Sequence, residues 1–65
     1  MIYSVDEFKN GGKYEGYKLN GKREGFGIYT YQEGGRYEGE WKNDLMCGKG
    51  KLFYQSGKIA YDGEL

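Results

Sequence analysis

The fold is decided by the stretch Tyr37-Glu38-Gly39-Glu40-Trp41-Lys42, in which aromatic or small residues alternate with charged ones. A period of two places Tyr37, Gly39 and Trp41 on one face of a strand and the charged residues on the other. A second stretch, Gly48-Lys49-Gly50-Lys51-Leu52-Phe53-Tyr54, alternates in the same way. The two stretches therefore predict two-sided partner strands joined by a connection over residues 43–47.

The Tyr-x-Gly pattern recurs with a period of 23 and then 24 residues, at Tyr14-Gly16, Tyr37-Gly39 and Tyr61-Gly63. A fixed period of this length indicates stacked supersecondary units. Further aligned pairs support the period: Gly25 with Gly48, Gly27 with Gly50, and Tyr31 with Tyr54. We therefore divide a single domain, residues 1–65, into a trailing half repeat (1–13), repeat one (14–36), repeat two (37–60) and the start of a further repeat (61–65).

Turn residues separate the alternating stretches. Glycine or asparagine can supply positive φ at Asn20-Gly21, Glu33-Gly34-Gly35, Asn43-Asp44 and Ser56-Gly57. The simplest topology is all-β, an antiparallel meander of stacked β-hairpin repeats that forms a single-layered twisted sheet. We expect strands near residues 2–8, 13–19, 25–31, 36–42, 48–54 and 58–64.

Glycines at alternate strand positions are predicted to leave room for aromatic rings from neighbouring strands, because they have no Cβ. The glycines assigned this role are Gly16, Gly25, Gly27, Gly39, Gly48 and Gly50. The remaining structural residues of the repeat are the expected ring donors Tyr14, Tyr37, Tyr54 and Tyr61, together with Trp41 and Gly63. The alternative, that the glycines only mark loops, does not account for Gly-x-Gly recurring ahead of an aromatic-rich strand.

Composition narrows the function classes. Ten basic and ten acidic residues cancel and are interspersed, so no nucleic-acid partner is indicated. A chain of 65 residues buries only about 60% of its unfolded surface, so help from repetition or a partner is expected. The lone Cys47 cannot form an internal disulfide, and the first ten residues lack the features of a signal peptide. These features lead us to expect a cytoplasmic location.

The sequence predicts no catalytic, cofactor or metal site. It contains no histidine, so a serine or cysteine nucleophile would lack its usual base and zinc would lack an imidazole ligand. The carboxylates alternate with basic residues, which favours a solvated ladder of cross-strand charges. The stretch from Gly16 to Arg23 has the glycine spacing of a phosphate loop but ends in arginine, with no helix pattern after it.

Candidate partner-binding residues come from an apolar group in repeat one. Parity places Tyr17, Leu19, Phe26 and Ile28 together on the face opposite the glycines, where repeat two has Glu40, Lys42, Lys49 and Lys51. Such a cluster predicts a surface covered by a partner helix or another chain. The alternative is that residues 2–8 and the chain ends fold over it, with Tyr3 and Val5 sharing the cluster. Leu45 and Met46, with Cys47, are read as an apolar loop tip that is either a second contact or a local plug.

The motif Tyr37-Glu38-Gly39-Glu40-Trp41-Lys42-Asn43, followed by Gly48-Lys49-Gly50, closely resembles the MORN repeat (membrane occupation and recognition nexus). A second copy begins at Tyr14 and a third at Tyr61, so the resemblance covers residues 8–65. It implies stacked β-hairpins in an elongated single sheet. It also implies scaffolding and protein docking in cytoskeletal, ciliary or membrane-junction assemblies. Repeat one departs from the pattern with Lys18 where repeat two has Trp41, which predicts a weaker aromatic shelf.

Two functions follow from these observations. The preferred one is a non-enzymatic scaffold that docks a protein partner, a larger assembly or, through its open edge strands, another copy of itself. The alternative is a peripheral module that binds phosphoinositides or anionic membranes. Its candidate head-group contacts are Lys22, Arg23, Lys49, Lys51 and Lys58.

Overall fold

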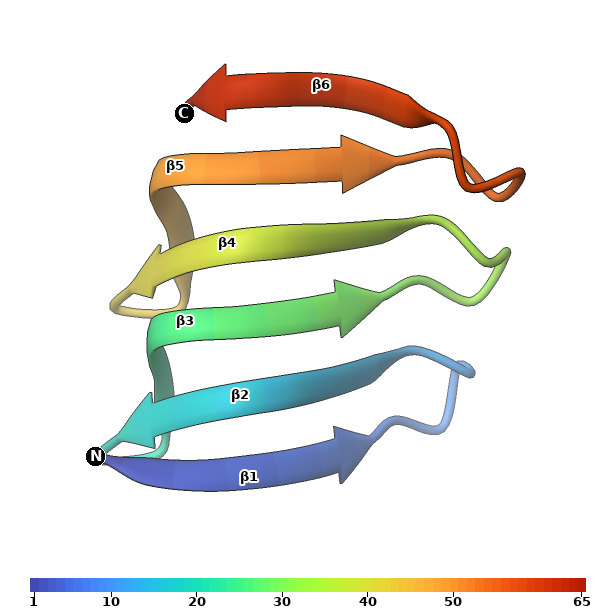
Figure 1. Ribbon diagram of the computed structural model, residues 1–65. Helices are drawn as coiled ribbons and strands as arrows, with labels where there is room; N and C mark the ends of the chain where they lie inside the picture. The colour runs from blue at the N-terminus through green and yellow to red at the C-terminus, as the bar shows by residue number, and fades with distance from the viewer.

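The computed structural model describes all 65 residues as one sheet of six antiparallel strands. The strands are β1 (Ile2–Glu7), β2 (Lys13–Leu19), β3 (Lys22–Thr30), β4 (Arg36–Lys42), β5 (Leu45–Phe53) and β6 (Ile59–Glu64). Each strand pairs with its neighbours in chain order, with β1 and β6 at the two open edges (Figure 1). The predicted all-β meander is confirmed. The molecule measures only 14 Å along its shortest axis, which agrees with a single bent layer. The structure contains no helix that could span a lipid bilayer.

Two kinds of turn alternate along the meander. Tight two-residue turns at Asn20-Gly21 and Asn43-Asp44 join β2 to β3 and β4 to β5, with φ of 52° and 80° in the first and 50° and 69° in the second. Positive φ at both central residues matches the right-handed twist of the flanking strands. The longer turns at the opposite end of the sheet (Figure 1) repeat one bonding pattern. In the middle one, Tyr31 N–H donates to the Gly35 carbonyl oxygen at 2.8 Å.

The start of two strands was predicted wrongly. β3 begins at Lys22 and not at residue 25, and β5 begins at Leu45 and not at residue 48, because the preceding turns are only two residues long. The extra residues are accommodated as irregularities in the β2·β3 and β4·β5 registers. Gly25 and Gly48 lie in these irregular stretches, with φ of 83° and 58°.

Gly25 and Gly48 therefore do not have the role that the sequence suggested. A Cβ on Gly25 would lie 3.4 Å from the Met1 side chain, and one on Gly48 would meet the Glu40 carboxylate. Neither glycine lies under an aromatic ring. Glycine fits these positions because L-residues with a side chain rarely adopt such backbone angles, and the resulting bulge bends the sheet.

The buried core consists of aromatic rings and bare backbone. Of the eight buried residues, Tyr14, Tyr37 and Trp41 are the only large ones. The other five are glycines: Gly12, Gly16, Gly27, Gly39 and Gly50. The chain therefore folds by packing rings onto strands and not by packing two layers of aliphatic side chains. We call the side that carries Tyr14, Tyr37 and Trp41 the ring face, and the opposite side the back face.

Each buried tyrosine covers a glycine in the next strand. A Cβ added to Gly27 would lie 2.6 Å from Cε1 and Cζ of Tyr14, and one added to Gly50 would lie 2.6 Å from Cζ of Tyr37. These glycines are directly opposite Gly16 and Gly39 in the sheet register. Real Cβ atoms do not approach ring carbons this closely, so the absence of a side chain is a steric requirement.

The two remaining ring donors are placed differently. Tyr54 follows β5 in a turn, where its N–H donates to the Lys58 carbonyl oxygen at 2.8 Å, and it is 61% exposed. The prediction that Tyr54 lies over a glycine gap is therefore wrong. Tyr61 lies on the edge strand β6 beside Gly63 and has no further strand to cover.

We predict that Gly50→Ala destabilises the fold by about 2–3 kcal/mol, because the new methyl group overlaps the Tyr37 ring. The matched control is Gly63→Ala, where the nearest atom to the added Cβ is the Tyr61 hydroxyl at 3.3 Å. That change should alter the free energy of unfolding by less than about 1 kcal/mol. Urea unfolding followed by Trp41 fluorescence measures both values, and equal effects at the two sites would contradict the steric explanation.

Candidate functional site

Trp41 links the two repeats on the ring face. Its ring meets Tyr14 edge to face, with centroids 5.6 Å apart at 87°, and meets Tyr37 at 5.2 Å and 88°. The indole Nε1–H donates to the Gly27 carbonyl oxygen at 3.2 Å. Edge-to-face pairs place the positive rim of one ring against the negative face of another, which stabilises this geometry. A residue of repeat two thus packs directly on the tyrosine of repeat one.

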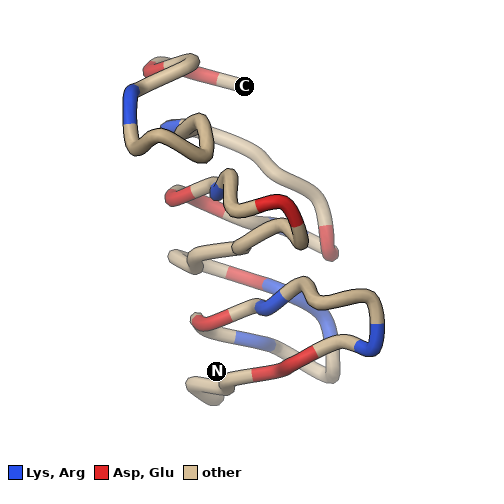
Figure 2. Tube along the Cα trace, turned by 90° about the vertical axis from the view of Figure 1, so that its right-hand side faces the viewer, with Lys and Arg blue, Asp and Glu red and all other residues tan.

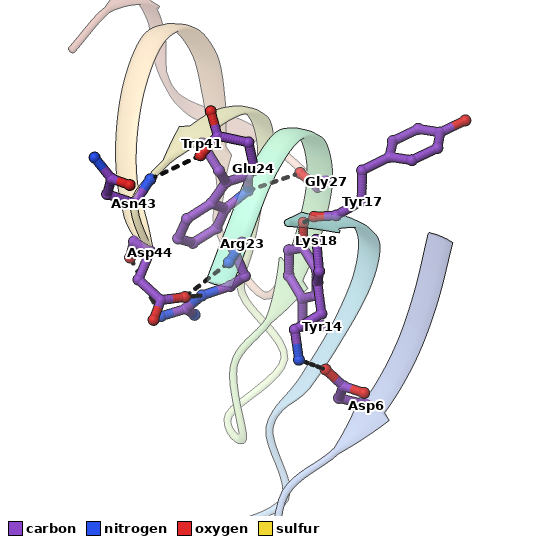
Figure 3. A network of polar contacts seen from close by, with 10 residues as sticks. All are labelled: Asp6, Tyr14, Tyr17, Lys18, Arg23, Glu24, Gly27, Trp41, Asn43 and Asp44. Atoms are coloured by element: carbon purple, nitrogen blue, oxygen red, sulfur yellow. Dashed lines mark hydrogen bonds and ion pairs between the residues drawn. The ribbon is translucent and has the colours of Figure 1, made fainter. Parts of the chain in front are cut away.

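Arg23 and Asp44 form a second link between the repeats (Figure 3). The guanidinium carbon lies 4.6 Å from the centroid of the Trp41 ring and 5.5 Å from that of Tyr29, within the range of cation–π attraction. Arg23 Nε donates to Asp44 Oδ1 at 3.0 Å, and its backbone N–H donates to the same oxygen at 2.9 Å. In return the Asp44 N–H donates to the Arg23 carbonyl oxygen at 3.1 Å. The tight turn of repeat two is therefore fastened to the start of β3.

These contacts border an apolar concavity of about 480 Å³, which we call the ring-face hollow. It is lined by Arg23, Tyr29, Tyr31, Trp41, Asp44, Leu45 and Met46. The Tyr29 ring lies 5.0 Å from Tyr31 and 6.3 Å from Trp41, so three aromatic rings from two strands and a turn converge there. The hollow thus has apolar walls and one ion pair at its border.

Leu45 and Met46 are not a loop tip as predicted. They form the first residues of β5, opposite Lys42 and Trp41 in the register. Met46 packs against the aromatic cluster, which agrees with the local-plug alternative. Leu45 is 69% exposed and forms a wall of the ring-face hollow, so it remains available for a contact.

The ring face differs between the repeats because Lys18 stands where repeat two has Trp41. Lys18 Nζ reaches Asp6 Oδ2 at 2.7 Å. Asp6 precedes Tyr29 by one repeat period of 23 residues. An ion pair in the first unit thus takes the place of the Tyr29–Trp41 ring contact in the second. The weaker aromatic shelf that the sequence predicted for repeat one is this replacement of a ring contact by an ion pair.

The back face carries the apolar cluster of repeat one. The side chains of Tyr17, Leu19 and Phe26 are 42%, 46% and 54% exposed, and Ile28 is half-buried between Glu15 and Glu38 in the register. We call the back-face patch the group formed by these four predicted residues and two from β1, namely Tyr3, Val5, Tyr17, Leu19, Phe26 and Ile28.

The alternative that residues 2–8 fold over this patch is wrong. β1 pairs edge to edge with β2 in the same layer, with Tyr3 opposite Tyr17. The two rings meet at 5.4 Å and 80°, and Tyr3 and Val5 are themselves 55% and 54% exposed. The first strand therefore extends the patch, as the alignment of Tyr3 and Val5 with the repeat indicated, and does not cover it.

The candidate head-group contacts do not converge on one site. Lys51 faces Glu38 on one side and Asp62 on the other. Lys49 faces Glu64 across β5·β6. Lys22 follows the tight turn after β2, Lys58 lies in the turn before β6 at the other end of the sheet, and Arg23 is paired with Asp44. Figure 2 shows the same interspersion of positive and negative residues along the trace.

The shifted pKa values at the site arise from hydrogen bonds and burial within the sheet. Hydrogen bonds from Lys18 and then Ser4 lower the pKa of Asp6 below its ordinary value, and the backbone N–H and then the guanidinium of Arg23 do the same for Asp44. Burial raises the pKa of the Tyr14 and Tyr37 hydroxyls. No three potential metal ligands gather anywhere in the structure.

Sequence reasoning missed the ring-face hollow. Its walls come from β3 and the turn after it, from β4 and the turn after it, and from the start of β5, and the last of these had been assigned to a loop. One signal was present: Tyr29 and Tyr31 lie at alternate positions, which places both on the side of Gly27. The position of Arg23 could not be found in this way, because it depends on the bulge at Gly25.

Comparison with known families identifies the repeat. The family model of the MORN repeat matches the chain twice, at residues 14–36 and 37–59. The two matches cover more than two thirds of the chain. They include both tyrosines that cover a glycine in the next strand, Tyr14 and Tyr37. None of the curated proteins matches the chain.

We predict that stability is constant near neutral pH and falls as the pH drops below about 3.8, the ordinary value for Asp6 and Asp44. Because both pKa values are lowered in the folded chain, the unfolded chain binds more protons in this range, and protonation favours unfolding. Urea midpoints measured between pH 7 and pH 2.5 test this. A variant with Asp6→Asn and Asp44→Asn should be less stable at pH 7, and its urea midpoint should lose most of its dependence on pH. An unchanged slope of the urea midpoint against pH would refute the assignment of this dependence to Asp6 and Asp44.

Proposed function

The chain belongs to the MORN-repeat family, and from this we propose that it is a non-enzymatic scaffold that docks a protein partner on its back-face patch. MORN repeats are interaction modules that contact proteins or membranes. The partner is a protein, and it contacts the apolar back-face residues of β1, β2 and β3.

One observation carries this assignment. Repeat two has Lys49 and Lys51 at the positions of Phe26 and Ile28, one period of 23 residues later, and it forms the same hairpin. The fold therefore does not need apolar side chains at these positions. Exposed apolar residues that the architecture does not require indicate a surface kept for a contact.

The composition of the patch supports a protein ligand. Aromatic residues are enriched where protein partners meet, because they bury much area for few rotatable bonds. The patch contains three aromatic rings, on Tyr3, Tyr17 and Phe26. A charged ladder in which Lys51 alternates with Glu38 and Asp62 borders it, which suits the polar rim of an interface.

The charges offer less to an anionic membrane. Attraction to such a surface grows with the number of basic residues presented together. Here the net charge is zero, and two of the back-face lysines, Lys49 and Lys51, face carboxylates across β5·β6. These facts support protein docking over the phosphoinositide alternative.

We predict that Phe26→Lys with Ile28→Lys weakens partner binding at least about tenfold while changing the free energy of unfolding by less than about 1 kcal/mol. Both lysines are the residues that repeat two carries, and they would face Glu40, Glu15 and Glu38. A matched control, Gln32→Lys with Gln55→Lys, adds the same charge in two exposed turns.

Partner proteins are captured from native extracts with the wild-type chain and with the control. Each is then purified and titrated against all three chains, and the affinities are compared. Far-ultraviolet circular dichroism checks the sheet. If the partner binds the patch variant and the wild-type chain with equal affinity, the contact does not lie on the back-face patch. Flotation with vesicles that contain phosphatidylserine or phosphoinositides at physiological salt should leave the chain unbound, and retention on these vesicles alone would replace protein docking with membrane binding.

A further inference from the structure

Two hollows on the ring face lie one repeat apart. Besides the ring-face hollow there is a smaller one of about 300 Å³, which we call the polar hollow. Five of its residues precede residues of the ring-face hollow by 23 positions. The equivalent pairs are Asp6 and Tyr29, Phe8 and Tyr31, Lys18 and Trp41, Gly21 and Asp44, and Arg23 and Met46. The repeat therefore presents the same concavity twice, once with mostly apolar walls and once with mostly polar ones.

The Tyr29 ring is a wall of both hollows. Phe8, in the polar hollow, stacks on Tyr29 with centroids 5.8 Å apart and an interplanar angle of 20°. Tyr31, in the ring-face hollow, lies 5.0 Å from Tyr29 at 51°. A row of three rings thus crosses from one hollow to the other. The two hollows are therefore parts of one aromatic surface.

The distance between the hollows limits what can fill both. Neighbouring strands lie about 4.8 Å apart, so a step of two strands is about 9.6 Å. In a polyproline II helix every third residue returns to the same side after about 9.3 Å. An extended β-strand returns its side chains to one side after about 6.7 Å and about 13 Å, and neither value matches. An α-helix comes close, with about 10.5 Å for seven residues. A polyproline II segment and an α-helix therefore both match the spacing.

Unused hydrogen-bond donors at the hollows distinguish these two ligands. Lys18 Nζ has one partner, Asp6 Oδ2 at 2.7 Å. Arg23 donates to Asp44 through Nε at 3.0 Å and through Nη2 at 3.3 Å, and its Nη1 has no partner in the chain. The carbonyl oxygens of an α-helix are bonded within the helix, whereas those of a polyproline II segment are free. Cationic N–H groups are complementary in charge to free carbonyl oxygens, so this surface favours the polyproline II segment.

We propose that the ring face binds a proline-rich segment of a partner protein in the polyproline II conformation. Two prolines three positions apart occupy the ring-face hollow and the polar hollow, and Tyr29 lies between them. Proline-rich segments dock in aromatic-lined grooves because their conformation is formed before binding. Lys18 and Arg23 donate to carbonyl oxygens of the segment. The ring face is opposite the back-face patch, so this contact is additional to docking on that patch.

A synthetic peptide tests the proposal on the intact chain. The probe is acetyl-Pro-Pro-Ala-Pro-Pro-Ala-Pro-Pro-Ala-Pro-amide, in which prolines recur three positions apart. It is titrated to several millimolar into the ¹⁵N-labelled chain by nuclear magnetic resonance. The largest shift changes should occur at residues that line the two hollows, at the amides of Lys18, Tyr31 and Leu45 and at the indole N–H of Trp41.

Two control peptides test the conformation of the ligand. The first is the same peptide built from D-amino acids, which has equal apolar surface and forms a helix of the opposite hand. It should bind at least about tenfold more weakly than the probe, because its carbonyl oxygens are misplaced for the cationic donors. The second is an alanine-rich helical peptide with two leucines seven positions apart, which should also bind more weakly than the probe.

Three equivalent side chains provide matched variants of the chain. Phe8, Tyr31 and Tyr54 follow one another at intervals of 23 residues, and Tyr54 borders neither hollow. Phe8→Ser and Tyr31→Ser should each weaken binding of the probe at least about fivefold, whereas Tyr54→Ser should bind it like the wild-type chain. Amide spectra of the free variants check the sheet. Phe8 is 41% exposed and follows the end of β1, so Phe8→Ser keeps the sheet even if Tyr31→Ser does not.

The proposal is overturned if the probe causes no shift changes, if these centre on the back-face patch, or if either control peptide binds as tightly as the probe. Equal affinity of the Phe8→Ser and Tyr54→Ser chains for the probe would also overturn it. The chain with Phe26→Lys and Ile28→Lys should bind the probe like the wild-type chain, which separates this result from docking on the back-face patch. Loss of binding in that chain would place the contact on the other face and contradict the proposal.

Discussion

Tyr14 places the hydroxyl end of its ring over Gly27, and Tyr37 does the same over Gly50, so each repeat is held to backbone that has no side chain of its own. This constraint explains why five of the eight buried residues are glycines. The sheet needs no second layer, because the rings lie directly on the strands and Trp41 fills the angle between them. A single layer in turn leaves most side chains of the other face in solvent. The surfaces available to partners are therefore a consequence of how the core is built.

The two repeats share a backbone and differ in what they display. On the ring face, the Lys18–Asp6 ion pair of the first unit corresponds to the Trp41–Tyr29 contact of the second. The apolar ring-face hollow lies beside the second unit, and the smaller polar hollow, bordered by Asp6 and Lys18, lies beside the first. On the back face the difference is reversed, since Phe26 and Ile28 of repeat one correspond to lysines in repeat two. Because the steric requirement falls on the tyrosines and glycines, the positions between them can vary without loss of the fold. That freedom lets a repetitive sheet carry distinct contact surfaces at defined spacings.

Much of the fold could be predicted from the sequence, because alternation is a local property. The meander, the two faces of β4 and the turns at Asn20-Gly21 and Asn43-Asp44 follow from period-two patterning and turn residues. The starts of β3 and β5 could not be predicted from the sequence. The bulges at Gly25 and Gly48 shift the strand register, but the alternation of residue types along the sequence does not reveal them. Because the start of β5 was predicted three residues too late, Leu45 and Met46 were wrongly assigned to a loop. Arg23 over Trp41 depends on contacts between strands, which no single stretch of sequence encodes. Partner binding by the back-face patch stays a prediction.

The most direct test of the central claim is a nuclear Overhauser measurement on the folded chain in solution. If the tyrosine rings cover the glycines of the next strand, the ring Hε protons of Tyr14 and Tyr37 will show strong cross-peaks to the Hα protons of Gly27 and Gly50. The exposed turn glycines Gly21 and Gly57, which have no atoms near the position of a Cβ, will show none. Absence of the ring–glycine cross-peaks in a sample whose backbone amides still report the six-stranded sheet would contradict the account.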